Sequence, residues 1–405
     1  MRVLVVAEYY PRAADPVLGV WAHRQALAAR EAGAETRVLV LHRPLPPLSA
    51  LRSRRIQAIA APIRQPRRAQ LDGIRVDYVR YLSPPRPSSY ASWGAWAAPP
   101  LARSLNRVRR AFPFDLIHAH YAVPAGDAVR RAAPGAPLLV SVHGGDVHGT
   151  HAGSTAIRDT LAHARLVLAN SAGTAQRCRE HGARRARVVH LGSDLPSAPT
   201  PRAPTPTLVT VGHLIARKRH ADVIGALALL RDRHPDLRYV IIGDGPERAP
   251  LEALAASLGV QRQVEFRGQL PHREAMSAAR ECSIFVLPSV REAFGVAYVE
   301  AMAGSVPAIG CVGEDGPEEI AAAGGGIALV DAGDTRALAD RIDALLTEPD
   351  ALETMGRAAR DTVERCFTWQ RCGRDTVQAY RDALELELDR DAPGVKADRD
   401  VLDGL

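Results

Sequence analysis

Short apolar runs alternate with helical patterns along almost the whole 405-residue chain. Runs such as RVLVVA (2–7) and TRVLVL (36–41) are typical of buried strands, and the spacing between them predicts a helix over 20–33. The series continues with apolar runs at 115–120, 137–143 and 165–170. Strands that alternate with helices predict a parallel sheet covered on both faces, which is a doubly wound, Rossmann-like α/β unit.

A proline-rich stretch divides the pattern into two series. Residues 196–207 (PSAPTPRAPTPT) contain five prolines and neither a helical nor a strand period, so we interpret them as a linker. A second series of strands then follows at 207–212, 237–243, 264–268, 283–288, 306–310 and 326–330. We therefore predict two Rossmann-like domains facing each other across a cleft. The first domain is expected over 1–195, the linker over 196–207 and the second domain over 208–370. A terminal helix over 371–388 is expected to pack back on the first domain, and residues 389–405 to form a mobile tail.

The composition favours a soluble protein with a sizeable core, because 46% of the residues are hydrophobic and 24% are charged. No apolar run approaches the roughly 18 residues that a membrane-spanning helix needs. The N-terminus leads directly into a strand without the features of a signal peptide, so we expect a cytoplasmic protein. The five cysteines form no CxxC pair, which indicates reduced thiols rather than a disulfide framework or structural zinc.

The charge is divided unevenly between the two halves. Residues 1–195 hold 28 arginines, no lysine and 12 acidic residues, a net charge of +16, whereas the remainder holds 24 basic and 33 acidic residues, a net of −9. Ten of the arginines lie between Arg43 and Arg86, among prolines. Either this segment meets an anionic membrane surface or a lipid-phosphate acceptor, or it is a solvated arginine-rich loop. Few aromatic residues accompany the arginines, which disfavours nucleic acid.

Two carboxylates stand at a notable spacing in LPSVREAFGVAYVEAMAG, which begins at Leu287. Glu292 lies in a loop after a strand, and Glu300 lies on the helix that begins near Gly295. Carboxylates in these positions can accept hydrogen bonds from sugar hydroxyls, although a first-turn glutamate and a surface glutamate would give the same spacing. The chain also uses 50 arginines but only two lysines, Lys218 and Lys396, which suggests that a compact ammonium is wanted at Lys218.

These residues resemble the E-x7-E signature of family 4 glycosyltransferases, which are retaining enzymes of the GT-B fold. The resemblance covers nearly the whole chain. Further segments resemble family motifs and follow one another in the family's order: VGHLIARKRH (211–220), IIGDGPERAPLEALAASLGV (241–260), FRGQLPHREA (266–275) and GEDGPEEI (313–320). In the N-terminal half, residues 9–33, 117–128 and 140–147 look closest to members that make exopolysaccharide and teichuronic acid.

The resemblance implies a role for each matching residue. Glu300 matches the carboxylate that binds the nucleotide ribose, and Glu292 matches the carboxylate beside the donor sugar. Lys218 matches the cation that neutralises the diphosphate, and His143 matches the histidine near the transferred sugar. The expected catalytic set is thus His143, Glu292 and Lys218, and the expected donor-binding set is Gly19, Arg217, Lys218, Gly243, Leu270, Phe294, Gly295 and Glu300. On the acceptor side we expect His120, Arg54 and Arg67, with His118 a weaker candidate.

Two departures from the family pattern affect the diphosphate site. His213 stands where the family usually has an arginine, which shifts the positive charge to Lys218 and Arg217. The loop near Gly19 lacks the paired glycines common in the family.

The implied reaction moves a sugar from a UDP- or GDP-sugar to a glycan or lipid-linked acceptor with retention, and the leaving phosphate takes the acceptor proton. We expect no cofactor and no metal, because the DxD pattern occurs only at Asp389/Asp391 and Asp398/Asp400, in the expected tail. The alternatives are a sugar-nucleotide epimerase of the same fold and a non-catalytic sugar-nucleotide-binding subunit. A nicotinamide dehydrogenase is disfavoured because GDGPER (243–248) lacks the third glycine of GxGxxG. We expect a peripheral association with the inner membrane face.

Overall fold

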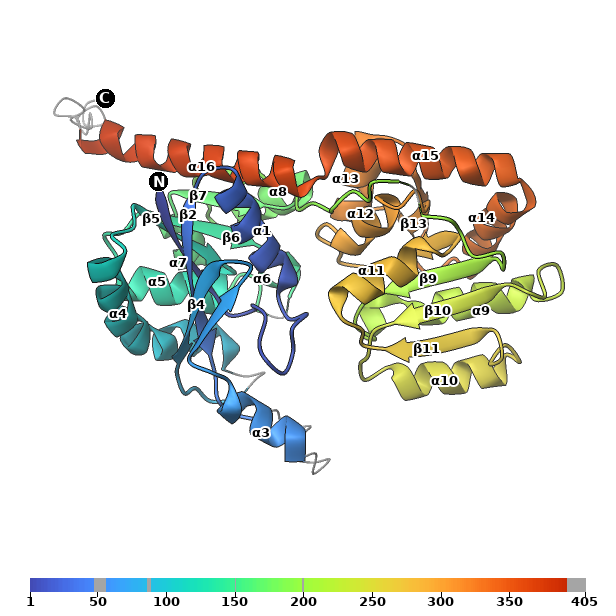
Figure 1. The fold of residues 1–405 in the computed structure, drawn as a ribbon, viewed down its shortest axis with the longest axis horizontal. Helices are drawn as coiled ribbons and strands as arrows, with labels where there is room; N and C mark the ends of the chain where they lie inside the picture. Colours follow the sequence, from blue (N-terminus) through green and yellow to red (C-terminus); the bar gives the residue numbers. More distant parts are fainter. Residues whose placement is uncertain (47–55, 86–88, 150, 199, 392–405) are drawn as a thin grey trace, which may run out of the picture.

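The computed structural model describes residues 1–405 except 47–55, 86–88, 150, 199 and 392–405. The described residues form two α/β domains, each with its own sheet, and the last two helices run along one side of both domains (Figure 1). The prediction of two Rossmann-like domains with parallel sheets is confirmed.

The first domain is built on an eight-stranded sheet with the order β3-β4-β2-β1-β5-β6-β7-β8, in which β3 and β4 form an antiparallel hairpin and the other neighbours are parallel. Its strands are β1 (Arg2–Ala7), β2 (Glu35–His42), β3 (Arg68–Leu71), β4 (Ile74–Arg80), β5 (Leu116–His120), β6 (Leu138–Val142), β7 (Leu166–Ala169) and β8 (Ala186–Val188). The helices around it are α1 (Val20–Glu31), α3 (Ile56–Arg64), η1 (Tyr90–Ser92), α4 (Trp93–Ala111), η2 (Ala122–Gly126), α5 (Asp127–Ala132), α6 (Gly144–His148), α7 (Thr155–His163) and α8 (Ala172–Glu180).

The second domain has a six-stranded parallel sheet with the order β11-β10-β9-β12-β13-β14. Its strands are β9 (Thr207–Val211), β10 (Arg238–Ile242), β11 (Val264–Gly268), β12 (Ile284–Val286), β13 (Ala308–Cys311) and β14 (Ile327–Val330). The helices are η3 (Ala216–Lys218), α9 (His220–Leu230), α10 (Arg248–Ser257), α11 (His272–Arg280), α12 (Val296–Met302), α13 (Asp315–Ala323), α14 (Thr335–Thr347), α15 (Pro349–Cys366) and α16 (Trp369–Asp391).

The central strands are apolar on both sides because helices cover both faces of each sheet. Along β1, Val3 and Val5 face a core cluster that continues into the second domain, whereas Leu4 and Val6 face a separate cluster under α4. Because successive side chains of β1 point to opposite faces of the sheet, the first domain has two cores. One core lies within the first domain, and the other extends across the interface into the second domain.

Helix α16 begins in the second domain and packs on the first (Figure 1). Gly373 lies so close to α1 that a Cβ on it would be 2.2 Å from the Ala28 carbonyl oxygen. Further along, the Tyr380 hydroxyl and His118 Nδ1 are 2.7 Å apart. The other nitrogen of the His118 ring lies 2.7 Å from Ser141 Oγ on β6, so the ring connects α16 to two neighbouring strands of the sheet.

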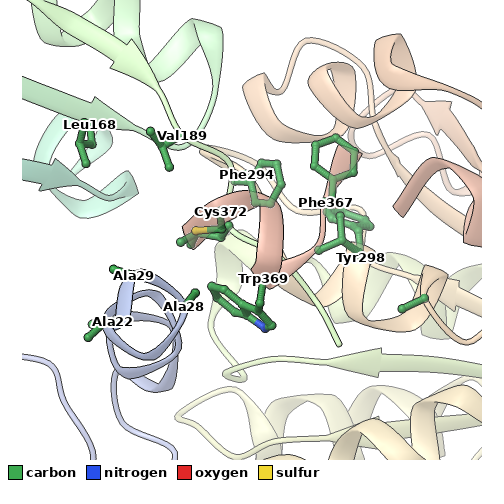
Figure 2. Packing of buried hydrophobic residues seen from close by; sticks show 14 of the residues in the cluster. Ala22, Ala28, Ala29, Leu168, Val189, Phe294, Tyr298, Phe367, Trp369 and Cys372 are labelled. Atoms are coloured by element: carbon green, nitrogen blue, oxygen red, sulfur yellow. The ribbon is translucent and has the colours of Figure 1, made fainter. Parts of the chain in front are cut away.

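Aromatic side chains fill the place where the chain crosses back between the domains (Figure 2). Phe294 and Phe367 lie 5.5 Å apart between ring centroids, and His190 of the first domain contacts both rings. Trp369, at the start of α16, is 4% exposed and packs in the same cluster. This apolar interface is continuous with both sheets.

Two sequence expectations need correction. The segment between Arg43 and Arg86 is not simply a solvated loop, because residues 68–80 of it form the β3–β4 hairpin at the edge of the sheet and residues 56–64 form α3. The terminal helix runs to Asp391, so the first residues of the expected tail are helical, and residues 392–405 lie outside the described residues.

Candidate active site

Two loops of the second domain bring a cation and a carboxylate together. Lys218 lies in the loop after β9, and Glu292 lies in the loop after β12, the neighbouring strand. Lys218 Nζ donates to Glu292 Oε2 at 2.5 Å, and Ser289 Oγ donates to the same oxygen at 2.9 Å. Because the two strands are parallel and adjacent, their carboxyl ends deliver these side chains to one edge of the sheet.

The environment keeps Glu292 ionised although its side chain is buried. Burial by itself raises the pKa of this carboxyl, but the positive charges of Lys218 and Arg217 and the hydrogen bonds outweigh burial, so the net shift of the Glu292 pKa is downwards. Arg217 Nη1 lies 3.5 Å from Glu292 Oε2. The structure therefore brings Arg217, Lys218 and Glu292 into one charged cluster.

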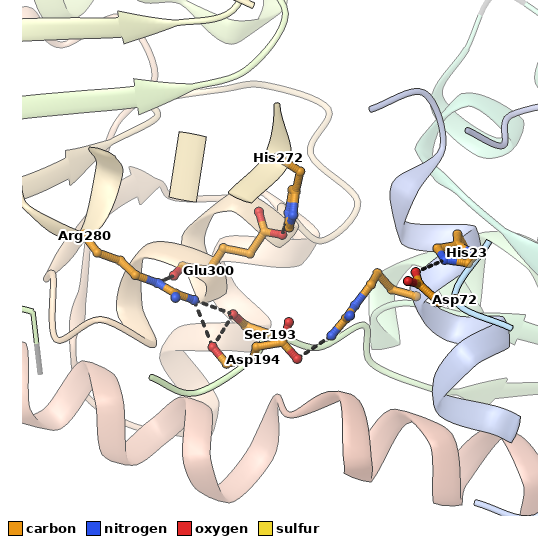
Figure 3. A network of polar contacts seen from close by, with 8 residues as sticks. His23, Asp72, Ser193, Asp194, His272, Arg280 and Glu300 are labelled. Carbon is orange, nitrogen blue, oxygen red and sulfur yellow. Dashed lines mark hydrogen bonds and ion pairs between the residues drawn. The ribbon is translucent and has the colours of Figure 1, made fainter. Parts of the chain in front are cut away.

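Glu300 stands in a second polar group, eight residues further along. It lies on α12, which begins after Gly295, a residue with φ +81 whose Cβ would collide with the Tyr298 ring at 2.4 Å. Glu300 Oε1 is 2.6 Å from His272 Nε2 at the start of α11 (Figure 3). This hydrogen bond, more than the opposing effect of burial, raises the pKa of His272.

A cavity of about 380 Å³ lies between the two domains beside Glu300. The second domain contributes Glu300, Gly243 and Leu270 to its lining, and the first domain contributes Gly19 and Trp21. Four expected donor-binding residues from separate parts of the sequence thus line one cavity, and His213 lines it as well.

Gly19 has a steric reason to be glycine. Its φ is +65, and a Cβ on it would lie 2.2 Å from the carbonyl carbon of Tyr9. It immediately precedes α1, a twelve-residue helix whose N-terminus therefore lies at the cavity. The free N–H groups and the positive dipole of a helix N-terminus favour an anion.

His143 forms the N-terminal boundary of α6 and is buried against His120. His143 Nε2 and His120 Nδ1 are 3.3 Å apart, and the two rings stack. Burial lowers the pKa of His143 to about 3, so the ring is neutral at physiological pH. Its backbone N–H donates to Asp146 Oδ2 at 3.1 Å, which fixes the turn.

The His143 turn faces the Glu292 loop across the cleft. A Cβ placed on Gly144 would be 3.2 Å from Ala293 Cβ, so the chain after His143 approaches the chain after Glu292. The three expected catalytic residues therefore lie on loops that approach each other between the domains. None of these three residues, nor His120, lines the 380 Å³ cavity.

Other expected site residues lie elsewhere. Phe294 is 1% exposed, and its side chain packs on His190 and Phe367 in the apolar interface rather than lining the cavity. Arg67 is exposed just before β3, and its carbonyl accepts from the backbone N–H of Tyr78. Arg54 lies outside the described residues.

Polar contacts hold the two domains around the cleft (Figure 3). Arg280 Nη2 donates to the Asp194 carbonyl at 2.9 Å, and the Asp194 carboxylate pairs with Arg24 of α1. Nearer the cavity, Gln269 Nε2 donates to Asp15 Oδ1 at 3.1 Å. These contacts connect the loop before α1 and α1 itself to the second domain.

Several functional candidates were missed from sequence. His272 and Trp21 line the cavity, and Ser289 and Glu314 hold Glu292, whose backbone N–H donates to Glu314 Oε2 at 2.7 Å. Each of the four lies within a segment already quoted for the family resemblance, so the motifs located the region, but no single residue in them stood out.

Within the described ranges, no group of three or more His, Cys, Asp or Glu side chains is arranged to hold a metal ion. No helix in that part of the chain is both long and apolar enough to cross a membrane.

Two parallel-sheet α/β domains, with a cavity between them lined from both sides, define the GT-B architecture. Residues 18–196 match the family model described as Glycosyltransferase Family 4, and residues 196–362 match the model described as Glycosyl transferases group 1. Two glycosyltransferase family models thus match residues 18–362 in succession, which supports a family 4-like glycosyltransferase of the GT-B fold.

Known proteins agree with this assignment. The chain is 32% identical over 198 residues to the glycogen synthase of Mycobacterium tuberculosis, a match that covers 47% of this chain and 46% of that protein. The chain thus spans about half the length of the curated relatives that it matches. In fold, it resembles the sucrose-phosphate synthase of Thermosynechococcus elongatus, with a TM-score of 0.76, 18% identity, and coverage of 95% of this chain and 100% of that one. It also resembles Anabaena HepE, solved in complex with UDP and glucose, with a TM-score of 0.70, 19% identity, and coverage of 94% and 100%.

Proposed function

We propose that this protein transfers a sugar, with retention, from a nucleotide-sugar donor to a glycan or lipid-linked acceptor in the synthesis of a cell-surface polysaccharide. The observation that carries the proposal is the interdomain cavity, where Glu300 and Gly243 of one domain face Gly19 and the N-terminus of α1 of the other. A carboxylate that accepts hydrogen bonds from ribose hydroxyls thus lies beside a helix N-terminus that favours an anion, and a nucleoside diphosphate requires both.

In this proposal the nucleoside occupies the 380 Å³ cavity. Glu300 accepts hydrogen bonds from the ribose hydroxyls. Its hydrogen bond with His272 is either kept or replaced when the nucleoside binds. The diphosphate extends toward Lys218 and Arg217, whose charges stabilise it as it departs. HepE, which has the same fold, is solved with UDP and with UDP-glucose, which supports a uridine nucleotide as the first donor to test.

The reaction then takes place between the Glu292 loop and the His143 turn. The bond from the anomeric carbon to the diphosphate breaks, the acceptor oxygen attacks from the same face, and its proton passes to the leaving phosphate oxygen. Glu292 contacts the donor sugar, and neutral His143 forms a hydrogen bond to a sugar hydroxyl. No metal is assigned a role in these steps.

The acceptor reaches this point from the first domain, which also carries the basic segment. Helix α3 in that segment exposes Ile56 (80%) and Ile63 (55%). Apolar side chains beside arginines suit the headgroup region of an anionic bilayer. We therefore propose reversible, peripheral binding to the inner membrane face.

Thermal-shift screening with UDP-, GDP- and ADP-sugars tests the donor site, because a ligand that binds the native state raises the melting temperature. Product analysis then distinguishes the alternatives. A transferase forms a glycoside only when an acceptor is added, whereas an epimerase releases free sugar or the epimer without one. A binding subunit would give a thermal shift and no product. No stabilisation by any nucleotide sugar would refute the proposed function.

A further inference from the structure

Helix α13 of the second domain packs on α8 of the first domain, where the two domains meet (Figure 1). Asp315, the first residue of α13, contacts the first domain through its carboxylate. Arg177 of α8 donates to this carboxylate twice, from Nε to Oδ2 at 3.1 Å and from Nη2 to Oδ1 at 3.4 Å. His148 Nε2, at the end of α6, lies 3.4 Å from Oδ2. None of the proposed roles involves Asp315.

The surroundings of the Asp315 carboxylate favour one geometry for this contact. Its side chain is 13% exposed and that of Arg177 is 42% exposed, so water reaches the ion pair mainly from the Arg177 side. Gly173, on the first turn of α8, lies so near that a Cβ on it would be 2.2 Å from Asp315 Oδ1. The hydrogen bond to Asp315 outweighs burial and raises the pKa of Arg177, because the carboxylate stabilises the guanidinium charge. An arginine–carboxylate pair with two hydrogen bonds also fixes the orientation of its partners.

The two neighbours of Asp315 hold the Glu292 loop. The carboxylate of Glu314 accepts from the backbone N–H of Glu292 at 2.7 Å, and the backbone N–H of Gly316 donates to the Glu292 carbonyl at 3.0 Å. Gly316 lies so close to this loop that a Cβ on it would be 2.1 Å from the Phe294 carbonyl oxygen. The turn that carries Asp315 therefore ties the Glu292 loop to the first domain.

On the first domain, the same ion pair reaches the short helix that follows His143. His143 forms the N-terminal boundary of α6, and His148, which lies beside the Asp315 carboxylate, is the last residue of that helix. Helix α6 also packs on α8, which carries Arg177. The contact between Asp315 and Arg177 therefore determines how the His143 turn faces the Glu292 loop.

We propose that Asp315 is a positioning residue, whose ion pair with Arg177 aligns the Glu292 loop with the His143 turn for sugar transfer. This inference rests on the proposed function, because that proposal places the transfer between these two loops. Asp315 itself contacts neither the donor nor the acceptor in this assignment.

Removing the ion pair should leave both the fold and the nucleotide site intact. A second contact between the same two helices remains, because the backbone N–H of Ala172 donates to Glu319 Oε2 at 2.9 Å. The proposed nucleotide contacts lie on other elements, with Lys218 after β9 and Glu300 on α12. Loss of Asp315 should therefore change the alignment of the loops without changing the affinity for a nucleotide.

Disulfide formation measures that alignment directly. Gly144→Cys and Ala293→Cys are introduced together in the full chain, because a Cβ on Gly144 would be 3.2 Å from Ala293 Cβ, close to the roughly 3.5–4.5 Å that disulfides span. The rate of cross-linking by glutathione disulfide, with UDP present, is followed by mass spectrometry. Each cysteine introduced alone reports any pairing with the five native thiols.

In this double-cysteine parent, Asp315→Asn and Arg177→Gln should each slow cross-linking about tenfold, as expected for loss of a hydrogen bond between charged groups. Arg177→Lys keeps the positive charge and should restore part of the rate. Asp232→Ala, at a 93% exposed side chain of the second domain, is the matched control and should cross-link like the parent.

The kinetic measurement uses the native cysteine background and a donor and acceptor that support glycoside formation. Asp315→Asn should lower kcat about tenfold and leave the KM for the donor within about twofold, because only the alignment for transfer is lost. UDP affinity, measured by calorimetry, should also stay within about twofold, which shows that the variant is folded.

Parental cross-linking or an unchanged kcat in Asp315→Asn would overturn the inference while the proposed function stands. The same holds if Arg177→Lys cross-links no faster than Arg177→Gln, or if Asp315→Asn loses UDP affinity together with turnover. If the wild type binds no nucleotide or forms no glycoside, the proposed function itself fails.

Discussion

The ammonium of Lys218 and the carboxylate of Glu292 are 2.5 Å apart, on loops that follow neighbouring strands of one sheet. Each group is the main counter-charge of the other, so a diphosphate that draws Lys218 away leaves Glu292 with Arg217 and Ser289. The two residues expected to act on different parts of the donor therefore form one coupled unit.

Replacing Lys218 with alanine should lower turnover about 10²-fold, because it removes a charge that stabilises the departing diphosphate. It should also raise the pKa of Glu292, whose buried carboxylate loses its strongest positive neighbour. Steady-state kinetics with a nucleotide-sugar donor measures the first effect. Arg262→Ala, at an exposed position of the same domain, is the control. A normal rate in Lys218→Ala would show that the leaving group is stabilised elsewhere.

The pair formed by His272 and Glu300 should make stability depend on pH. The hydrogen bond to Glu300 raises the folded-state pKa of His272 above its ordinary value of 6.5. The stabilisation of the fold by protonated His272 is therefore fully present below pH 6.5, and it is lost as the pH rises through the folded-state pKa of His272. His272→Gln should lower the melting temperature more at about pH 5.5 than at about pH 9. Equal losses at both pH values would mean that the pair does not stabilise the fold.

Asp146→Ala should destabilise the first domain by about 3 kcal/mol, because it leaves two buried backbone donors without a partner. The N–H groups of Ala122 and His143 donate to its two oxygens at 3.0 and 3.1 Å. Urea unfolding measures the change in the free energy of unfolding. Asp232→Ala, at a 93% exposed side chain, should change it by less than about 0.5 kcal/mol. If Asp146→Ala lowered the free energy of unfolding no more than Asp232→Ala does, water would be replacing the carboxylate as the partner of the two N–H groups.

Treatment with EDTA should leave transferase activity essentially intact, because Lys218, Arg217 and the α1 N-terminus supply the positive charge for the diphosphate. The measurement compares initial rates before and after dialysis against the chelator. A strict requirement for added Mn²⁺ or Mg²⁺ would contradict this assignment.

Vesicles that contain anionic lipid should bind the protein reversibly, and salt should weaken the binding. Replacing Arg52, Arg54, Arg55, Arg67 and Arg68 with glutamine should weaken it further, at about 1 kcal/mol for each charge near the surface. The matched control replaces five exposed arginines of the second domain and its helices: Arg231, Arg262, Arg336, Arg357 and Arg365. Co-sedimentation that is equal with neutral and anionic vesicles, or absent with both, would show that the basic segment is only solvated.

The two domains could be predicted because each central strand is a run of apolar residues and the proline-rich linker interrupts the series. The β3–β4 hairpin could not, since the many arginines of its segment obscured the alternation in IRVDYV (74–79). Along β4 the buried Ile74 and Val76 alternate with the exposed Arg75, so the apolar signal is half as dense as in a strand covered on both faces.

For the site, the spacing of Glu292 and Glu300 predicted two neighbouring carboxylates, but not that each has a different partner. Lys218 is 74 residues from Glu292, and His272 is 28 residues from Glu300, so only the folded sheet brings these pairs together. Phe294 lies within the same motif, yet its ring is needed in the apolar interface.

The crossing of α16 back to the first domain also bears on how the gene could be recombined. A second domain exchanged with a single junction in the linker would bring a foreign α16, whose fit on α1 requires the glycine at Gly373 and the hydroxyl of Tyr380 against His118. A hybrid enzyme with a new sugar preference therefore needs two junctions, one in residues 196–207 and one between α15 and α16 at Phe367 and Thr368. Chimaeras joined in this way should keep the parental thermal stability that single-junction hybrids lose.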